Sequence, residues 1–342
     1  MPNTGQKFDI MIIGAGSWGT TLSVMLAEKG LHVYLWARNE QRAKQIQKMR
    51  ENKRYTEELR LPSKVMAFND LKEVKACPDL VIFAVPSHAL REVVGHFYAY
   101  LDDLPKLKAA LNVAKGFETG TNLRLSEVMA DTLPARIKSK VAVLSGPNIS
   151  SEIGKKLPSV STVSSKNNHV LHWLQPLLST DYFRVYTNAD LVGVEIGGAV
   201  KNIIAIASGI SDGLGYGTNT KASLVTRGLH EITKFGTSMG ARMQTFAGIS
   251  GMGDLITTCF SPHSRNRLFG QKVALGQKPD HVQQSMFMVA EGFNTTLAVY
   301  KLAQNMGVSM PITECIHDIL YQQADPQNSV HRLMNRKFKS EI

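Results

Sequence analysis

A glycine-rich turn directly after the first apolar segment restricts this chain more than any other feature. Residues 8–13 have the pattern of a short β-strand, and Gly14-x-Gly16-x-x-Gly19 follows and opens a helix of small and apolar residues. In such a turn the first glycine allows the tight bend, the second lets the backbone approach a pyrophosphate, and the third lets the helix pack on the strand. The helix N-terminus adds unpaired N–H groups. The turn therefore predicts a dinucleotide site, with contacts from Gly14, Gly16, Ser17, Trp18 and Gly19.

The chain up to about residue 190 alternates short apolar runs with longer amphipathic ones, which is typical of β-α-β units on a parallel sheet. The expected strands are residues 8–13, 32–36, 80–85, 110–114, 141–144, 160–163 and 182–185. The expected helices between them are residues 18–28, 39–50, 87–100, 123–131 and 167–178.

Long helical periodicity replaces the strands from about residue 191. The expected helices are residues 192–210, 220–239, 253–259, 264–275, 294–306 and 312–321. A length of 342 residues agrees with two domains at about 150 residues each. We therefore expect an α/β Rossmann-type domain over residues 1–190 and an all-α domain over residues 191–342.

The residues after the second expected strand bear on the choice of cofactor. NAD-selective folds place an acidic residue there on the ribose 2′-hydroxyl, whereas this chain has Arg38 followed by Asn39. A guanidinium at this position can pair with a 2′-phosphate. The sequence predicts that NADPH is accepted and preferred over NADH, although Arg38 is also compatible with a solvated residue at a helix start.

The charge balance favours anionic partners, because 39 Lys and Arg residues exceed 28 Asp and Glu residues by 11. The most cationic stretch, residues 42–60, is interleaved with Glu51, Glu57 and Glu58 and contains few aromatic residues. We interpret it as a solvated helical face and expect no nucleic-acid partner.

The cysteines and apolar runs predict the compartment. Three cysteines lie far apart, outside any C-x-x-C spacing, so we expect reduced thiols in the cytoplasm and neither a disulfide framework nor a metal site. The N-terminal residues lack the pattern of a signal peptide. The most apolar run, residues 80–85, is far shorter than the roughly 20 residues of a transmembrane helix, so we expect no membrane insertion.

Four further segments contain candidate functional side chains. Lys115 and the segment 145–148 each follow an expected strand, at the edge where open α/β sheets bind ligands. Lys201 lies in an apolar, glycine-rich helical stretch, where it either reaches the surface or is held in a cleft. The fourth segment is Asp254 followed by residues 264–266, whose guanidinium, hydroxyl and amide groups at a helix start suit a phosphate, although a helix cap with two solvated residues is the alternative.

Together these segments resemble bacterial NAD(P)-dependent glycerol-3-phosphate dehydrogenase. The matching segments, in chain order, are residues 14–20, 115–118, 145–147, 200–202, 251–254, 264–266 and 289–292. The resemblance implies a Rossmann domain followed by a helical domain like that of 6-phosphogluconate dehydrogenase. It implies interconversion of dihydroxyacetone phosphate and sn-glycerol 3-phosphate with NADPH or NADH. The glycerol 3-phosphate is expected to supply phospholipid synthesis. The resemblance also points to a homodimer.

The resemblance also implies roles for individual residues. Lys201 is expected to donate and accept the proton at the substrate oxygen, with Lys115 as a cationic neighbour and Asp254 orienting both. The implied substrate contacts are Lys115, Gly146, Asn148, Lys201, Asp254, Ser264, Arg265 and Asn266. The implied cofactor contacts, besides the glycine turn, are Arg38, Lys115, Ser150, Arg265, Val289 and Glu291.

One segment departs from the family pattern. Asn148-Ile149-Ser150 stands where the family usually has a small or hydroxyl residue, an aromatic residue and alanine. Two other functions stay open at this point. A non-catalytic NADPH sensor has no need of Lys115, Lys201 or Asp254, and a dehydrogenase for another small hydroxy acid or phosphorylated polyol is expected to differ at residues 264–266.

Overall fold

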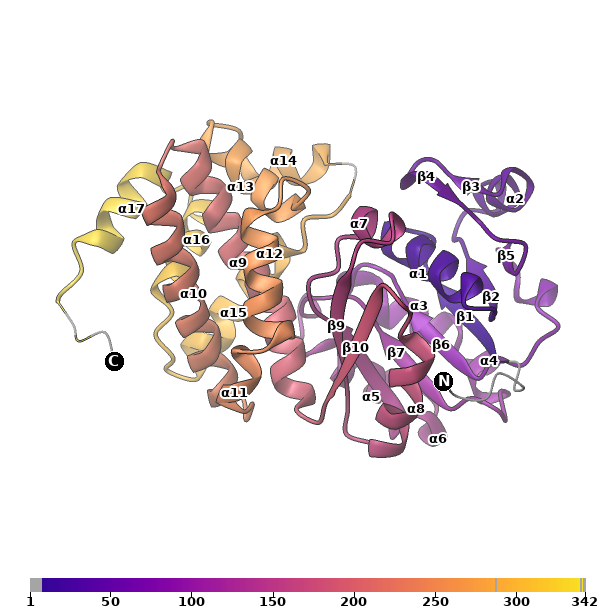
Figure 1. Cartoon of the computed structure of the whole chain (residues 1–342). Coiled ribbons are helices and arrows are strands. Elements are labelled where there is room, and N and C mark those ends of the chain that lie inside the picture. The colour runs from indigo at the N-terminus through magenta and orange to yellow at the C-terminus, as the bar shows by residue number, and fades with distance from the viewer. Residues whose placement is uncertain (1–7, 287, 339, 341–342) are drawn as a thin grey trace. The chain divides into compact units, whose positions relative to one another are not determined.

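The computed structural model describes residues 8–286, 288–338 and 340, and it divides into two compact units (Figure 1). Unit 1 comprises Met1–Lys115 and Leu123–Val194. Unit 2 comprises Gly116–Asn122 and Glu195–Ile342. The short segment after Lys115 thus belongs to unit 2, although the residues on both sides of it belong to unit 1.

Unit 1 is built on an eight-stranded sheet with the order β10-β9-β8-β7-β6-β1-β2-β5. The strands are β1 (Asp9–Ile13), β2 (His32–Trp36), β5 (Val65–Phe68), β6 (Leu80–Phe83), β7 (Ala109–Asn112), β8 (Val141–Ser145), β9 (Ser159–Ser165) and β10 (Phe183–Asn188). The six strands from β5 to β8 are parallel, and by their place in the chain they follow the order 3-2-1-4-5-6 of a doubly wound dinucleotide fold. The expected Rossmann class is therefore confirmed. The sheet is not wholly parallel, because β9 runs antiparallel to β8 and β10 follows the direction of β9.

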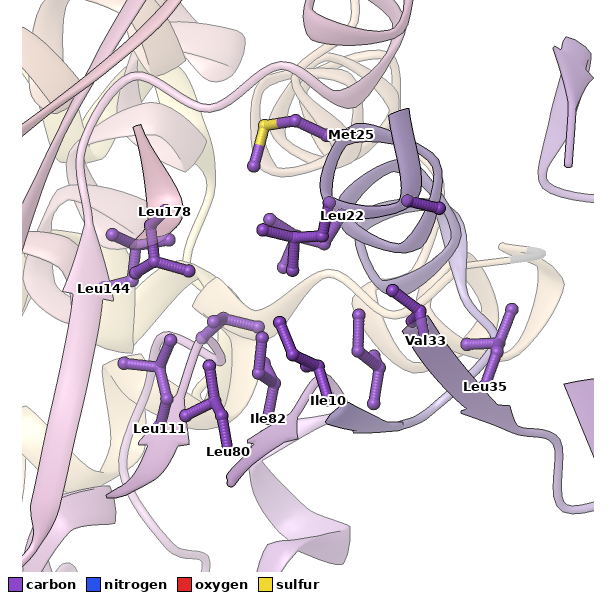
Figure 2. Packing of buried hydrophobic residues seen from close by; sticks show 14 of the residues in the cluster. Ile10, Leu22, Met25, Val33, Leu35, Leu80, Ile82, Leu111, Leu144 and Leu178 are labelled. Atoms are coloured by element: carbon purple, nitrogen blue, oxygen red, sulfur yellow. The ribbon is translucent and has the colours of Figure 1, made fainter. Parts of the chain in front are cut away.

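Both faces of this sheet are buried. The helices of unit 1 are α1 (Ser17–Glu28), α2 (Glu40–Met49), α3 (Leu90–His96), α4 (Tyr98–Asp102), α5 (Leu125–Thr132), α6 (Ala135–Lys138), α7 (Ser150–Gly154) and α8 (Asn168–Leu178). Along β1, Ile10 and Ile12 belong to one core cluster and Met11 and Ile13 to another. Figure 2 shows Leu22 of α1 facing Ile10 and its neighbours in the first of these clusters. Burial on alternate sides explains why the central strands are continuous apolar runs in the sequence.

The cationic stretch at residues 42–60 is not one helical face, so that interpretation was wrong. Helix α2 ends at Met49, because Arg50 adopts a left-handed conformation with φ 57° and a right-handed helix cannot continue through it. The chain then forms a small antiparallel hairpin from β3 (Glu51–Asn52) and β4 (Thr56–Arg60). This hairpin lies beside α1 and α2 (Figure 1).

Unit 2 consists of helices around a long central one. The helices are α9 (Leu191–Gly213), α10 (Thr218–Ser238), α11 (Met243–Phe246), α12 (Asp254–Phe260), α13 (Arg265–Ala274), α14 (Pro279–Ser285), α15 (Glu291–Asn305), α16 (Pro311–Tyr321) and α17 (Pro326–Met334). By length and composition α9 is the one helix among the described residues that suits a membrane span. However, 89% of its most apolar 18-residue window is buried inside the structure, as in the core helix of a globular unit.

Unit 2 also buries a carboxyl group, that of Glu231 on α10, whose exposed fraction is 5%. Its oxygens accept hydrogen bonds from the backbone N–H of Ile312 (2.6 Å) and Thr313 (3.2 Å) and from the Thr313 hydroxyl (3.3 Å), in the first turn of α16. Burial raises the pKa of Glu231 from 4.5 to about 7, and the three hydrogen bonds oppose this shift only in part.

We expect Glu231→Gln to flatten the pH dependence of stability. The folded pKa lies above that of the unfolded chain, so the folded state holds a proton that the unfolded chain releases between pH 4.5 and about 7. The stabilisation from this proton is complete below that interval and is lost as the pH rises through it. Urea unfolding midpoints at several pH values between about 5 and 7 should fall less steeply for Glu231→Gln than for the wild type. Parallel slopes for the two proteins would contradict the assignment.

Candidate active site

The glycine turn of unit 1 leaves open space at one glycine only. A Cβ atom on Gly14, whose φ is +120°, would lie 2.4 Å from the carbonyl oxygen of Ala84, and one on Gly19 would lie 2.0 Å from the carbonyl oxygen of Gly14. A Cβ atom on Gly16 would meet nothing within 4 Å. Gly16 is also the N-cap of α1 and makes no side-chain cap. Gly14 and Gly19 are thus required by the packing of the chain itself, whereas Gly16 leaves a cradle that fits a pyrophosphate at the helix N-terminus.

Arg38 lies at the same edge of the sheet, one strand further along. It follows β2, which pairs with β1 in register from Asp9 and His32 to Ile13 and Trp36. The Arg38 side chain is exposed, and the next residue, Asn39, caps α2 by accepting from the N–H of Arg42 (2.9 Å). The Arg38 side chain is therefore accessible at the end of the strand that pairs with β1.

The loops after β7 and β8 are connected to each other and to β9. Lys115 Nζ donates to the carbonyl oxygen of Gly146 at 2.8 Å. Asn148 Nδ2 donates to Ser161 Oγ (3.1 Å), which in turn donates to the carbonyl oxygen of Ser145 (3.1 Å). The amide of Asn148, where the chain departs from the family pattern, thus holds the loop to the antiparallel strand β9.

Ser150 and Trp18 lie on the helices around this edge. Ser150 begins α7, and its carbonyl oxygen accepts from Thr21 Oγ1 on α1 at 3.5 Å. Trp18, in the first turn of α1, packs against Phe183, with 6.3 Å between the ring centroids.

Unit 2 buries a lysine and an aspartate against each other. Lys201 on α9 is 6% exposed and Asp254 on α12 is 1% exposed. The Lys201 ammonium pairs with the Asp254 carboxylate and donates to Thr258 Oγ1 at 2.7 Å. Lys201 is therefore held within the fold and does not extend to the surface. An ammonium group is tolerated at such a place because a carboxylate and a hydroxyl together replace its hydration.

A π-helical turn, Ile249–Gly253, places Asp254 at the start of α12. A Cβ atom on Gly251 would lie 2.2 Å from the carbonyl oxygen of Phe246, and one on Gly197 would lie 2.7 Å from that of Ser250. The close approach of these backbones needs glycine at both positions. Such turns are often found at functional sites.

The start of α13 brings several predicted residues together. Ser264 caps the helix by accepting from the N–H of Arg267 (3.3 Å). Asn266 Nδ2 donates to Asn202 Oδ1 (2.9 Å), and Asn266 Oδ1 accepts from the N–H of Gly292 (2.9 Å). The Asn266 amide thus joins the ends of α13 and α15 to α9.

The guanidinium groups of α13 have different surroundings. Arg265 is exposed, and its Nη1 donates to the carbonyl oxygen of Val289 at 2.9 Å, two residues before Glu291 at the start of α15. Arg267 Nε pairs with Asp212 Oδ2 at 2.5 Å, and Lys221 pairs with the other oxygen of Asp212 at 2.6 Å. Arg265 is thus the more accessible cation for an anionic ligand.

Two protein-family models match this chain. The model described as "NAD-dependent glycerol-3-phosphate dehydrogenase N-terminus" matches residues 9–171, and the corresponding C-terminus model matches residues 190–331. The chain belongs to the NAD-dependent glycerol-3-phosphate dehydrogenase family. The resemblance expected from the sequence motifs is confirmed, and the chain is an NAD(P)-dependent oxidoreductase.

Relatives and a solved structure of this family extend over almost the whole chain. Glycerol-3-phosphate dehydrogenase [NAD(P)+] from Chlorobium limicola is 45% identical over 97% of this chain and 99% of the relative. The protein of the same name from Geobacillus kaustophilus is 45% identical over 98% and 96%. A crystal structure of glycerol-3-phosphate dehydrogenase from Coxiella burnetii has a TM-score of 0.89 and 37% identity, and covers 96% of this chain and 99% of its own.

Two polar residues that contact predicted site residues received no role in the sequence analysis, although Asn202 lies in the matching segment 200–202. Thr258 contacts Lys201, and because it lies four residues after Asp254 on one helix, the i, i+4 spacing was a usable signal. Asn202 contacts Asn266 from 64 positions away, which no local pattern indicates. Among the described residues, no group of three or more His, Cys, Asp or Glu side chains is arranged to hold a metal ion.

The contact between α9 and α13 generates a stability prediction for this dehydrogenase. A Cβ atom on Gly209 would lie 1.8 Å from the carbonyl oxygen of Arg267, and one on Gly270 would lie 2.1 Å from that of Ile206. We therefore expect Gly209→Ala to force the two backbones apart and to destabilise the protein by about 1 to 3 kcal/mol, measured by urea unfolding. The control is Gly95→Ala at an exposed position of α3, where a Cβ atom meets nothing within 4 Å, and it should be neutral or slightly stabilising. Equal stability of the two variants would contradict the contact.

Proposed function

We propose that the chain interconverts dihydroxyacetone phosphate and sn-glycerol 3-phosphate with NADPH or NADH, and that it supplies phospholipid synthesis in the cytoplasm as a homodimer. The observation that supports this most is the buried Lys201–Asp254 pair on the helical unit that also presents Arg265. A proton-transfer group and an anion-binding group on one unit suit a phosphorylated ketone. NADPH oxidation with dihydroxyacetone phosphate, compared with unphosphorylated dihydroxyacetone, tests the substrate, because equal rates would contradict a phosphate site.

The residues of the glycine turn fit the cofactor. Gly16 provides space for the pyrophosphate, Ser17, Trp18 and Gly19 form the helix N-terminus, and Arg38 provides a cation for the 2′-phosphate. The nicotinamide group supplies or accepts the hydride of the reaction. Ser150, Val289 and Glu291 complete our proposed set of cofactor contacts, together with Lys115 and Arg265.

Lys201 acts as the proton donor to the substrate C2 oxygen during reduction and as the acceptor during oxidation. The oxygen gains negative charge as the ketone is reduced, and an ammonium group both stabilises this charge and delivers the proton. Asp254 and Thr258 hold the ammonium in one orientation. Lys115 adds a second positive charge for the substrate.

The substrate phosphate binds at the start of α13. Arg265 offers charge-assisted donors, and the N-terminus of α13 adds its dipole. Ser264 and Asn266 complete the proposed phosphate contacts, and Gly146 and Asn148 are further proposed substrate contacts.

Removal of the positive charge at Arg38 should change the cofactor preference. In Arg38→Asp, kcat/KM with NADPH should fall relative to that with NADH by an amount on the order of 1 to 3 kcal/mol, because a carboxylate would repel the 2′-phosphate. Lys44→Asp on the following helix α2 is the control, since it makes the same charge change at an exposed lysine that pairs with exposed Glu40. An unchanged ratio in Arg38→Asp would remove Arg38 from the ribose site.

Arg265→Ala should raise KM for dihydroxyacetone phosphate strongly, with a smaller fall in kcat. The phosphate is remote from the reacting carbonyl, so its binding energy serves mainly to hold the substrate. Steady-state kinetics of Arg265→Ala and of the control Lys272→Ala, in the last turn of the same helix, check this. A wild-type kcat/KM in Arg265→Ala would place the phosphate elsewhere.

Lys201→Ala should abolish most turnover while NADPH binding is retained. General acid catalysis contributes about 10² to 10⁴-fold, and the loss of charge stabilisation at the same oxygen adds to this. Fluorescence titration with NADPH and measurement of kcat test the two effects separately. A near-normal kcat would remove Lys201 from the mechanism, whereas a loss of NADPH binding would show that it supports the nucleotide site.

A further inference from the structure

The segment between α2 and β6 contains two asparagines whose amides bind the backbone of the two nucleotide turns. Asn52 lies on β3, and Asn69 directly follows β5. We propose that both are positioning residues for the dinucleotide: Asn52 fixes the glycine turn, and Asn69 fixes the turn that bears Arg38. This inference rests on the cofactor site proposed above, and it concerns residues that the sequence analysis did not single out.

The Asn52 side chain connects the hairpin to both ends of the glycine turn. It is 3% exposed, and its Nδ2 donates to the carbonyl oxygen of Ala15 (3.0 Å) and to Thr20 Oγ1 (2.8 Å). Ala15 lies between the first two glycines of the turn, and Thr20 directly follows the third. One amide group thus holds the segment that must approach the pyrophosphate.

The hydrogen bond to Ala15 determines where a neighbouring donor points. The carbonyl group of Ala15 and the N–H of Gly16 belong to one rigid peptide plane and point in opposite directions. Gly16 has no side chain to restrict rotation of this plane, and its surroundings are open. The bond from Asn52 therefore fixes the orientation of the Gly16 N–H in the cradle.

Asn69 holds the second turn in a similar way. Its Nδ2 donates to the carbonyl oxygens of Ala37 (2.8 Å) and Arg38 (2.9 Å). The main-chain carbonyl oxygen of Asn69 accepts a hydrogen bond from Trp36 Nε1 at 2.9 Å. The Asn69 amide therefore binds the peptide group before Arg38 and the peptide group after it, which are the backbone from which the exposed Arg38 side chain extends.

The two asparagines act on different parts of the ligand. The pyrophosphate next to the glycine turn is common to NADPH and NADH, whereas only NADPH carries the 2′-phosphate that Arg38 is proposed to bind. Loss of Asn52 should therefore weaken both cofactors alike, and loss of Asn69 should weaken NADPH more than NADH. Each variant is the matched control for the other, because each removes from this segment one asparagine amide that donates two hydrogen bonds.

The experiment measures the Kd values of NADPH and NADH by fluorescence, and that of 2′-AMP by calorimetry, for wild type, Asn52→Ala and Asn69→Ala. Because 2′-AMP lacks the pyrophosphate, Asn52→Ala should bind both dinucleotides about tenfold more weakly and 2′-AMP normally. Asn69→Ala should lose about fivefold in affinity for NADPH and 2′-AMP, with little change for NADH. A merely structural defect would lower the fraction of protein that binds and leave these ratios unchanged.

Thr20→Val provides a second test should Asn52→Ala not fold, because it removes one acceptor of the Asn52 amide with little change in shape. It should weaken both dinucleotides in the same proportion and leave 2′-AMP binding unchanged. Wild-type affinities in the Asn52 and Thr20 variants would overturn the assignment of Asn52, and an unchanged NADPH to NADH ratio in Asn69→Ala would overturn that of Asn69. A wild-type protein that binds neither cofactor would instead contradict the proposed function.

Discussion

Close contact between backbones, possible only at glycine, determines where the functional groups of both units lie. Gly19 lets α1 pack against the turn at Gly14. Gly251 lets the π-helical turn, which directly precedes Asp254, pack against the backbone of Phe246. Gly209 and Gly270 bring α9 and α13 together, so that the amides of these two helices meet. At each position the Cβ atom of any other residue would overlap a backbone atom. The packing of the fold and the geometry of the site therefore depend on the same contacts.

Buried charge is handled in two different ways within unit 2. Lys201 and Asp254 neutralise each other, and the Thr258 hydroxyl satisfies a further donor of the ammonium. The Glu231 carboxyl accepts hydrogen bonds from the start of α16, and these replace only part of its hydration, so burial raises its pKa. A paired charge suits the proton-transfer role proposed for Lys201, which needs a fixed orientation. The carboxyl of Glu231 serves to attach one helix to another.

The sequence predicted the central strands because both faces of the sheet are buried, which leaves continuous apolar runs such as β1 and β6. It did not predict β5, because this apolar strand has only four residues, or the hairpin from Glu51 to Arg60, because its strands are short and polar. Arg50 ends α2 in a left-handed conformation that is rare for arginine. The family and its cofactors followed from the motifs. The contacts of Asn52, Asn69 and Asn202 depend on residues far away in the chain, so no local spacing indicates them. The catalytic and binding roles of the individual residues remain predictions.

The burial of α9 has a consequence for synthesis of the chain on the ribosome. The glycine contacts that cover this helix come from later residues, from Gly228 against Ile204 to Gly292 against Asn202. At about 5 to 20 residues per second, the ribosome needs several seconds to add these partners. During that time the nascent chain carries a helix with the length and hydropathy of a membrane span and without its cover. Cotranslational folding of unit 2 therefore begins while this apolar helix is uncovered, and its cover is complete only when α15 has left the exit tunnel.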